Sequence, residues 1–222
     1  MKLKEYFAQL KIDLKPMTFT EKVDHIWSYN KELILITAGM LVLVIGLLVA
    51  FIQKPDVVFC GYLINAEVND EGRAYLSSGY GNVIGVTGKQ EAQLLTGFFN
   101  TNITSAGEAN ESTWAQMSAL CQERELDYVM ADEATIKALT LTEMTMDLST
   151  FFTEEEFAAL QDKILYVELE DGTKIPCAVK INDTKFYKDC ISYYKDLYIC
   201  FICNTRNVDR CHEFWEYLNN WS

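Results

Sequence analysis

An uninterrupted apolar segment of twenty residues, Leu33 to Ile52, constrains this chain more than any other feature of its sequence. The segment carries no charge, and fourteen of its residues are Leu, Ile, Val or Phe. As an α-helix it is about 30 Å long, which matches the hydrocarbon core of a bilayer. These side chains favour membrane insertion by about 4 to 8 kcal/mol. The sequence therefore predicts one transmembrane helix over residues 33–52, with the lipid bilayer as the partner of this segment.

The flanks of this segment indicate a retained signal anchor. A secretory signal peptide has an apolar region of about 7–15 residues and a small-residue cleavage site, whereas Leu48-Val49-Ala50 is a poor match to such a site. Lys15, Lys22 and Lys31 precede the segment, and only Lys54 follows it closely. Because lysines are retained on the cytoplasmic side, we expect a single-pass protein of the cell membrane. Residues 1–32 form its cytoplasmic tail, and residues 55–222 form its extracytoplasmic domain.

The end of the tail predicts a short amphipathic juxtamembrane helix. Thr18 and Glu21 fit a capping box. Four apolar residues then recur at helical spacing: Phe19, Val23, Ile26 and Trp27. This lead-in resembles that of many uncharacterised single-span proteins of Gram-positive bacteria.

The charge of the chain is concentrated after the apolar segment. Residues 55–222 hold twelve basic and twenty-seven acidic residues, a net charge of −15, which disfavours nucleic acid as a partner. This acidity is typical of a solvated surface, and the alternative is an acidic patch that selects a cationic ligand. About 170 residues are enough for one domain with its own core.

All seven cysteines lie beyond the apolar segment, and their spacing matches no disulfide framework. Free thiols conflict with an oxidising exterior. Either the orientation is reversed, or the exterior of the host is not strongly oxidising, and both alternatives stay open.

Alternating apolar and polar segments predict an α/β fold for residues 55–222. The apolar run Asp56–Asn65 favours a strand buried on both faces of a parallel or mixed sheet. Leu126–Ala131 predicts a short strand, and Leu197–Cys203 predicts another fully apolar strand. Helix signals lie between or after them, with caps at Thr113, Asp132, Thr153 and Asn207. The fold class is thus one N-terminal transmembrane helix followed by a mixed-sheet α/β domain.

Turn residues predict the connections of this domain. Asp171-Gly172 indicates a hairpin between residues 164–170 and 173–181, and Pro176 places its second strand at an edge or a bulge. Residues 189–194 favour a helix. The four glycines of residues 79–88 predict a turn-rich connection, because they lack the context of a nucleotide-binding fingerprint.

No catalytic residue, metal site or cofactor is predicted. Cys200 and Cys203, with Cys211 and His212 downstream, could form a zinc or redox site. Within a strand, however, Cys200 and Cys203 would point to opposite faces and lie about 10 Å apart. We therefore interpret them as buried core cysteines.

Two passages resemble the type 2 periplasmic, or extracellular solute-binding, proteins. The first is Glu125–Glu133, with Met146-Asp147-Leu148 following it, and the second is Leu197–Leu218. The resemblance implies a lobe of a solute-binding protein, at about half the usual size of that family. It also implies that Asp132 and Glu133 face a ligand. The alternative for both residues is helix capping.

These observations predict a non-enzymatic, membrane-anchored extracytoplasmic domain that binds a partner or serves a membrane complex as a solute-binding-like subunit. Its partner would be a membrane protein or a small solute. One alternative is a membrane-tethered enzyme that uses carboxylates or a thiol. The other is a structural partner in an envelope assembly.

Overall fold

The structure, a computed structural model, describes residues 12, 15–99, 108–192 and 196–221. Residues 1–11 and 13–14 of the tail lie outside this described part of the chain. The chain divides into two compact units, Met1–Lys54 and Pro55–Ser222.

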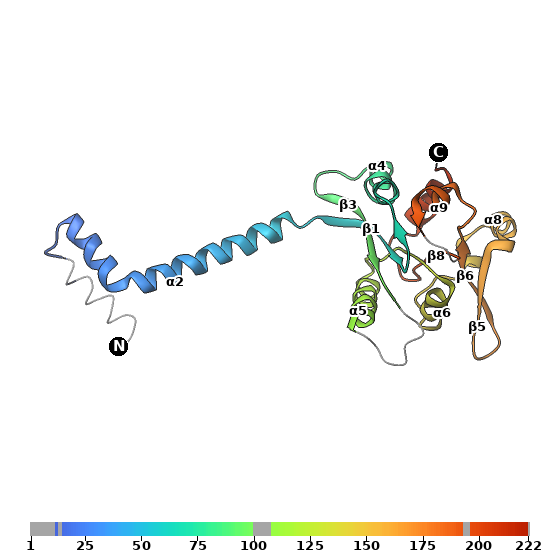
Figure 1. Ribbon diagram of the computed structural model, residues 1–222, viewed down its shortest axis with the longest axis horizontal. Coiled ribbons are helices and arrows are strands. Elements are labelled where there is room, and N and C mark those ends of the chain that lie inside the picture. Colours follow the sequence, from blue (N-terminus) through green and yellow to red (C-terminus); the bar gives the residue numbers. More distant parts are fainter. Residues whose placement is uncertain (1–11, 13–14, 100–107, 193–195, 222) are drawn as a thin grey trace. The chain divides into compact units, whose positions relative to one another are not determined.

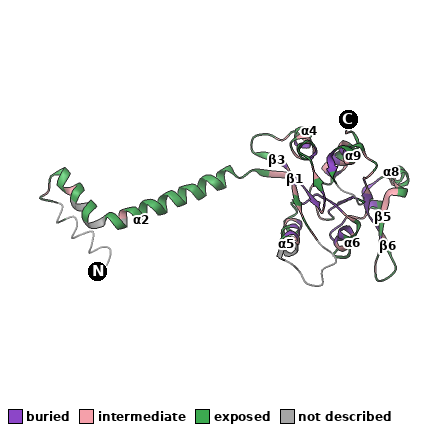
Figure 2. Cartoon of the chain, viewed as in Figure 1, coloured by how far each residue is buried: buried purple, intermediate pink, exposed green. Residues whose placement is uncertain are grey.

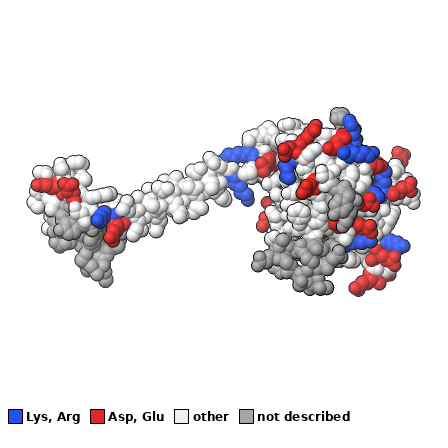
Figure 3. All heavy atoms as spheres, viewed as in Figure 1, with Lys and Arg blue, Asp and Glu red and all other residues white. Residues whose placement is uncertain are grey.

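The first unit contains the helix α2 (Phe19–Gln53). The Thr18 backbone N–H donates to Glu21 Oε2 at 2.8 Å, which confirms the expected cap. The juxtamembrane segment and the apolar segment form one continuous helix, not two. Among the described residues, its part Ile34–Gln53 is the one candidate membrane span by length and hydropathy, and no part of that span is buried (Figure 2). The surface of this candidate span carries no charged side chain (Figure 3).

The second unit is built on a mixed six-stranded sheet with the order β3-β1-β4-β8-β6-β5 (Figure 1). The strands of this sheet are β1 (Asp56–Ile64), β3 (Gln90–Gly97), β4 (Tyr128–Ala131), β5 (Ile164–Glu168), β6 (Lys174–Lys180) and β8 (Tyr198–Phe201). Strand β1 pairs in parallel with both β3 and β4. The pairs β4–β8, β8–β6 and β6–β5 are antiparallel. The predicted mixed α/β class is therefore confirmed.

Helices cover both faces of this sheet. On one face lie α3 (Asp70–Ala74), the π-helix η1 (Tyr75–Gly79), α4 (Tyr80–Val83), α7 (Leu148–Phe151), α8 (Glu154–Ala159), α9 (Lys185–Cys190) and α10 (Val208–Asn219). On the other lie α5 (Glu108–Glu123) and α6 (Glu133–Leu141) (Figure 1). The 3-10 helix η2 (Gln161–Lys163) precedes β5, and a separate small ladder joins β2 (Glu67–Val68) to β7 (Ile191–Ser192).

The alternation of β1 explains why its sequence is continuously apolar. Phe59 and Leu63 point into the core under α10 and η1, whereas Tyr62 and Ile64 point into the core under α5 and α6. Both faces of the strand are buried because helices cover both sides. Gly61 sits between these residues, where any Cβ would overlap the ring of Tyr128.

The glycine-rich segment folds differently from the prediction. Gly79 ends η1 and Gly81 lies within α4, so half of the predicted turn region is helical. Gly85 and Gly88 do occupy turns, with φ of 70° and 66°. The strand β3 follows them and was not predicted, because its Gln and Glu residues mask its buried Ala92 and Leu94.

The hairpin of β5 and β6 is confirmed, and Pro176 lies at a bulge. Leu165 pairs with Ala178, and Tyr166 pairs with Pro176, which leaves Cys177 as the extra residue. The edge alternative is wrong, because β6 lies between β8 and β5. Strand β6 tolerates the proline because β8 pairs only with its last two residues, Val179 and Lys180.

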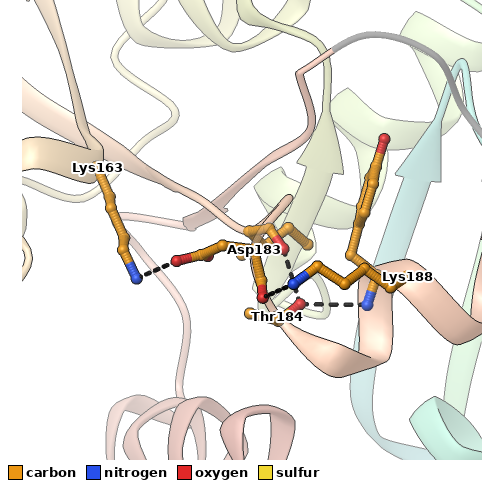
Figure 4. A network of polar contacts seen from close by, with 6 residues as sticks. Lys163, Asp183, Thr184 and Lys188 are labelled. Carbon is orange, nitrogen blue, oxygen red and sulfur yellow. Dashed lines mark hydrogen bonds and ion pairs between the residues drawn. The ribbon is translucent and has the colours of Figure 1, made fainter.

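The helix predicted at residues 189–194 begins and ends earlier, as α9. Its cap is Thr184, whose Oγ1 accepts from the Tyr187 N–H at 3.2 Å (Figure 4). Two lysines bond to Asp183 beside this cap. Lys163 forms an ion pair with the Asp183 carboxylate at 2.5 Å, and Lys188 Nζ donates to the Asp183 backbone carbonyl at 2.9 Å. The hydrogen bond from Lys163 lowers the pKa of Asp183. Residues 193–195 lie outside the described residues.

Candidate functional site

The two predicted ligand-binding residues lie where β4 ends and α6 begins. Asp132 caps α6, since its Oδ1 accepts from the Thr135 N–H at 2.8 Å. Its Oδ2 accepts from Asn65 Nδ2 at 2.9 Å. Glu133 forms an ion pair with Lys137 one turn along the helix. The expected cap is confirmed, and the role of these residues toward a ligand stays a prediction.

Asn65 fastens the carboxyl ends of the parallel strands together. It adopts a φ of 61°, and its side chain exchanges two hydrogen bonds with the backbone of Phe99, of 2.5 and 2.7 Å. Ligands of α/β sheets commonly bind at this edge. Here the side chains of Asn65 and Asp132 bind each other and the backbone, so this corner is closed by the protein's own groups.

A groove runs instead beside β3, the strand at one edge of the sheet. Two hollows of about 360 Å³ each follow this strand. The first is lined by Ser77, Ser78, Asn82 and residues 90–94, and the second by residues 66–68 and 96–98. Arg73 lines both hollows. We therefore treat them as one surface, the β3 groove, with Arg73 at its middle.

The outer side of β3 presents unpaired backbone groups to this groove. The carbonyls of Lys89 and Gly97 accept from β1 and from the residue after it, so the odd-numbered residues of β3 face β1. The backbone N–H and C=O groups of Ala92, Leu94 and Thr96 consequently face outward. Among the described residues no strand pairs with this side. An extended peptide could add to the sheet here.

A helical segment, α3 to α4, forms the wall of the β3 groove. Asn69 caps it, and the hydroxyls of Ser77 and Ser78 bond back to carbonyls one turn earlier, at 2.6 and 3.1 Å. Tyr75 anchors η1 by donating to the Tyr217 carbonyl at 2.5 Å. π-Helices are rare and occur frequently at functional sites. This wall therefore places Arg73 beside the strand.

Arg73 is the one basic residue among the described residues that line the β3 groove. Within the described part of the chain, the four ion pairs all use lysines, so none of them neutralises an arginine. Glu67 and Glu91 also line the groove, one in each hollow. Exposed Phe98 ends it with an apolar ring that is 66% accessible. The surface can thus offer backbone hydrogen bonds, one guanidinium and one aromatic contact.

Buried Asp127 belongs to the core and not to a site. Its carboxylate accepts from the Cys60 N–H at 2.7 Å, from Thr205 Oγ1 at 2.5 Å and from Asn207 Nδ2 at 3.0 Å. Burial raises its pKa, although these hydrogen bonds act against the shift. The network fastens the turn after β8 to β1, and its polar atoms point inward.

The cysteines form no chemical centre among the described residues. Cys200 is buried as predicted, but Cys203 is exposed because β8 ends two residues earlier, at Phe201. Burial raises the pKa of the Cys60 thiol to about 12, which keeps it protonated. In the described residues no group of three or more His, Cys, Asp or Glu side chains can hold a metal ion.

Comparison with protein-family models, curated proteins and solved structures finds no match to this chain. The resemblance to solute-binding proteins and to single-span Gram-positive proteins therefore stays a prediction.

Sequence reasoning missed the β3 groove because it missed β3. The available signal was the alternation of Ala92 and Leu94 with polar residues, after the turn at Gly88. No sequence pattern could identify Arg73 as a binding residue, because only the tertiary fold brings its helix beside β3.

Proposed function

We propose that this chain is a single-pass, membrane-anchored binding protein whose extracytoplasmic domain captures an extended segment of a partner protein beside β3. Helix α2 is the anchor, the tail lies in the cytoplasm, and residues 55–222 lie outside. The domain serves as a binding or accessory subunit of a membrane complex.

The exposed apolar surface of α2 supports the anchor. None of the described residues buries Ile34–Gln53, which has a mean hydropathy of 2.9. An uncovered segment of twenty residues that is apolar or small apart from Thr37 and Gln53 is strongly unfavourable in water and favourable in lipid. The lysines of the tail support its retention in the cytoplasm.

The β3 groove is the observation that carries the binding function. Strand addition needs a free strand edge, room beside it and side chains that select the partner. The outward backbone groups of β3 form the free strand edge, and the two hollows give the room beside it. Arg73 and Phe98 are the selecting side chains, since they favour a segment with one carboxylate and an apolar residue toward its end.

A selection experiment tests this function. Full-length chain in lipid nanodiscs is used to select from a displayed library of random peptides, and the affinity of enriched peptides is then measured. Thr96→Pro removes an outward N–H without disturbing the pairs between β3 and β1. We expect it to weaken binding about tenfold, the cost of one or two backbone hydrogen bonds.

Thr96→Ala is the matched control, because it shortens the same exposed side chain and keeps the N–H. Arg73→Gln should remove the preference for peptides that contain a carboxylate, while leaving the strand edge intact. Equal binding by Thr96→Pro and Thr96→Ala would contradict strand addition, as would the absence of any enriched peptide.

A further inference from the structure

We propose that one edge of the domain, formed at the end of the sheet where strand β1 begins, docks on the phospholipid headgroups of the membrane that holds α2. This inference rests on the proposed membrane anchor. It concerns a surface at the opposite end of β3 from Phe98 and is independent of peptide binding in the β3 groove.

Chain length places this edge within reach of the headgroups. Val58 lies five residues beyond Gln53, the last residue of α2, so their Cα atoms are at most about 18 Å apart. The headgroup layer is about 5–8 Å thick on each side of a bilayer. If α2 spans the membrane, groups that bond to Val58 cannot lie far from the phosphates.

Two separate segments meet at this edge. Arg210 Nη1 and Asn207 Nδ2 both donate to the Val58 carbonyl, at 2.8 and 3.2 Å. The turn between α4 and β3 lies here too, because the Asp56 N–H donates to the Lys89 carbonyl at 2.9 Å. Between the end of α4 and the start of α10 is a polar hollow of about 510 Å³.

Arg206 and Arg210 give this hollow its affinity for phosphate. Their bonds are to backbone carbonyls, Arg206 to Glu123 at 2.8 Å and Arg210 to Val58. Neither takes part in the ion pairs found among the described residues. A guanidinium has five N–H donors and binds phosphate through two at once, so donors remain available.

Exposed valines flank the arginines. Val83 at the end of α4 is 58% accessible, and Val208 at the start of α10 is 39% accessible. Burying such apolar side chains among the headgroups lowers the free energy of the docked state, while the neighbouring arginines bind phosphates.

The charge balance of this edge distinguishes it from the rest of the domain. Asp209 and Glu213 line the same hollow and offset Arg206 and Arg210. The domain as a whole carries −15. An anionic phospholipid surface therefore repels this edge less than it repels the domain as a whole. Because the attraction is local to the arginines, docking is expected with zwitterionic lipid as well.

A fluorescence measurement tests the docking. Full-length chain with Cys203→Ser and Val83→Cys is labelled with an environment-sensitive dye, since the other six cysteines are buried. The labelled chain is inserted into phosphatidylcholine nanodiscs that contain a headgroup-nitroxide lipid. A second protein carries the dye at Phe98→Cys, just beyond the far end of β3, which is about 25 Å long. We expect nitroxide quenching at residue 83 to exceed that at residue 98 about threefold.

Charge reversal separates docking from simple tethering. Arg206→Glu should lower the quenching at residue 83 about twofold, because it replaces the phosphate-binding group. Lys185→Glu makes the same change of charge at the start of α9 and should leave it unchanged. Thermal melting checks that both variants fold. Equal quenching at residues 83 and 98, or equal effects of the two reversals, would overturn the docking. A chain that does not enter nanodiscs would overturn the anchor itself.

Discussion

The buried hydroxyl of Tyr128 is the one side-chain polar atom of the described core without a hydrogen-bond partner. The ring stacks against Phe59 and Phe214, with centroids 5.6 and 4.3 Å away, and lies across Gly61. Ring packing thus fixes the side chain, and the hydroxyl loses its water without a replacement. Burial also raises the pKa of this phenol well above its ordinary value, so it stays protonated.

We therefore expect Tyr128→Phe to stabilise the domain by about 1 kcal/mol, since an unpaired buried hydroxyl costs about 1–3 kcal/mol. Tyr80→Phe is the control, because its hydroxyl donates to the Arg210 carbonyl at 2.5 Å. That substitution should destabilise by a similar amount. Urea unfolding of the full chain in detergent micelles measures both, and a less stable Tyr128→Phe protein would contradict the prediction.

At the scale of elements, the composition of α2 by itself indicates its environment, whereas the composition of β3 does not. Every residue of Ile34–Gln53 is apolar or small apart from Thr37 and Gln53, so any orientation of the helix presents the same surface. Strand β3 mixes Gln, Glu and Thr with buried Ala and Leu, because one edge of it pairs with no described strand and one of its faces is only partly covered. Its place at the edge of the sheet, not its composition, makes it a candidate binding element.

A charge at the centre of α2 tests its role as an anchor. Val44→Lys should oppose insertion by about 3 kcal/mol and move a large part of the chain from the carbonate-washed membrane to the soluble fraction. Val44→Leu keeps the helix apolar and should leave the distribution unchanged. Immunoblotting of the two fractions measures the change. The anchor would be wrong if the unchanged chain were itself recovered without membrane.

At the scale of the whole molecule, the exposed thiol of Cys203 reports orientation. The other six cysteines are buried, so Cys203 is the accessible thiol of the domain. With residues 55–222 outside, a membrane-impermeant maleimide should label intact cells, and Cys203→Ser should abolish this labelling. Partial burial raises the pKa of this thiol, so long labelling times are needed. Labelling only after lysis would reverse the proposed orientation.

The predictions from sequence differ in success for physical reasons. The caps at Asp132 and Thr153, and the hairpin at Asp171-Gly172, are local interactions within a few residues, and all are confirmed. Pro176 left two predictions open, an edge strand or a bulge. Its own residues could not decide between them, because whether β6 lies at the edge or inside the sheet depends on pairing with the distant strand β8. Cys203 was assigned to the core because the end of β8 depends on its partner strand, not on its own residues.

What the sequence by itself determined is the apolar helix, the mixed α/β class and the acidic domain, because composition and short-range periodicity are properties of contiguous residues. Only the tertiary structure decided which strand lies at the edge of the sheet and which side chains meet beside it. Arg73 reaches β3 through helix packing, and Arg210 reaches the start of β1 through a contact across about 150 residues of chain. Such meetings depend on long-range packing energies, which no local pattern encodes.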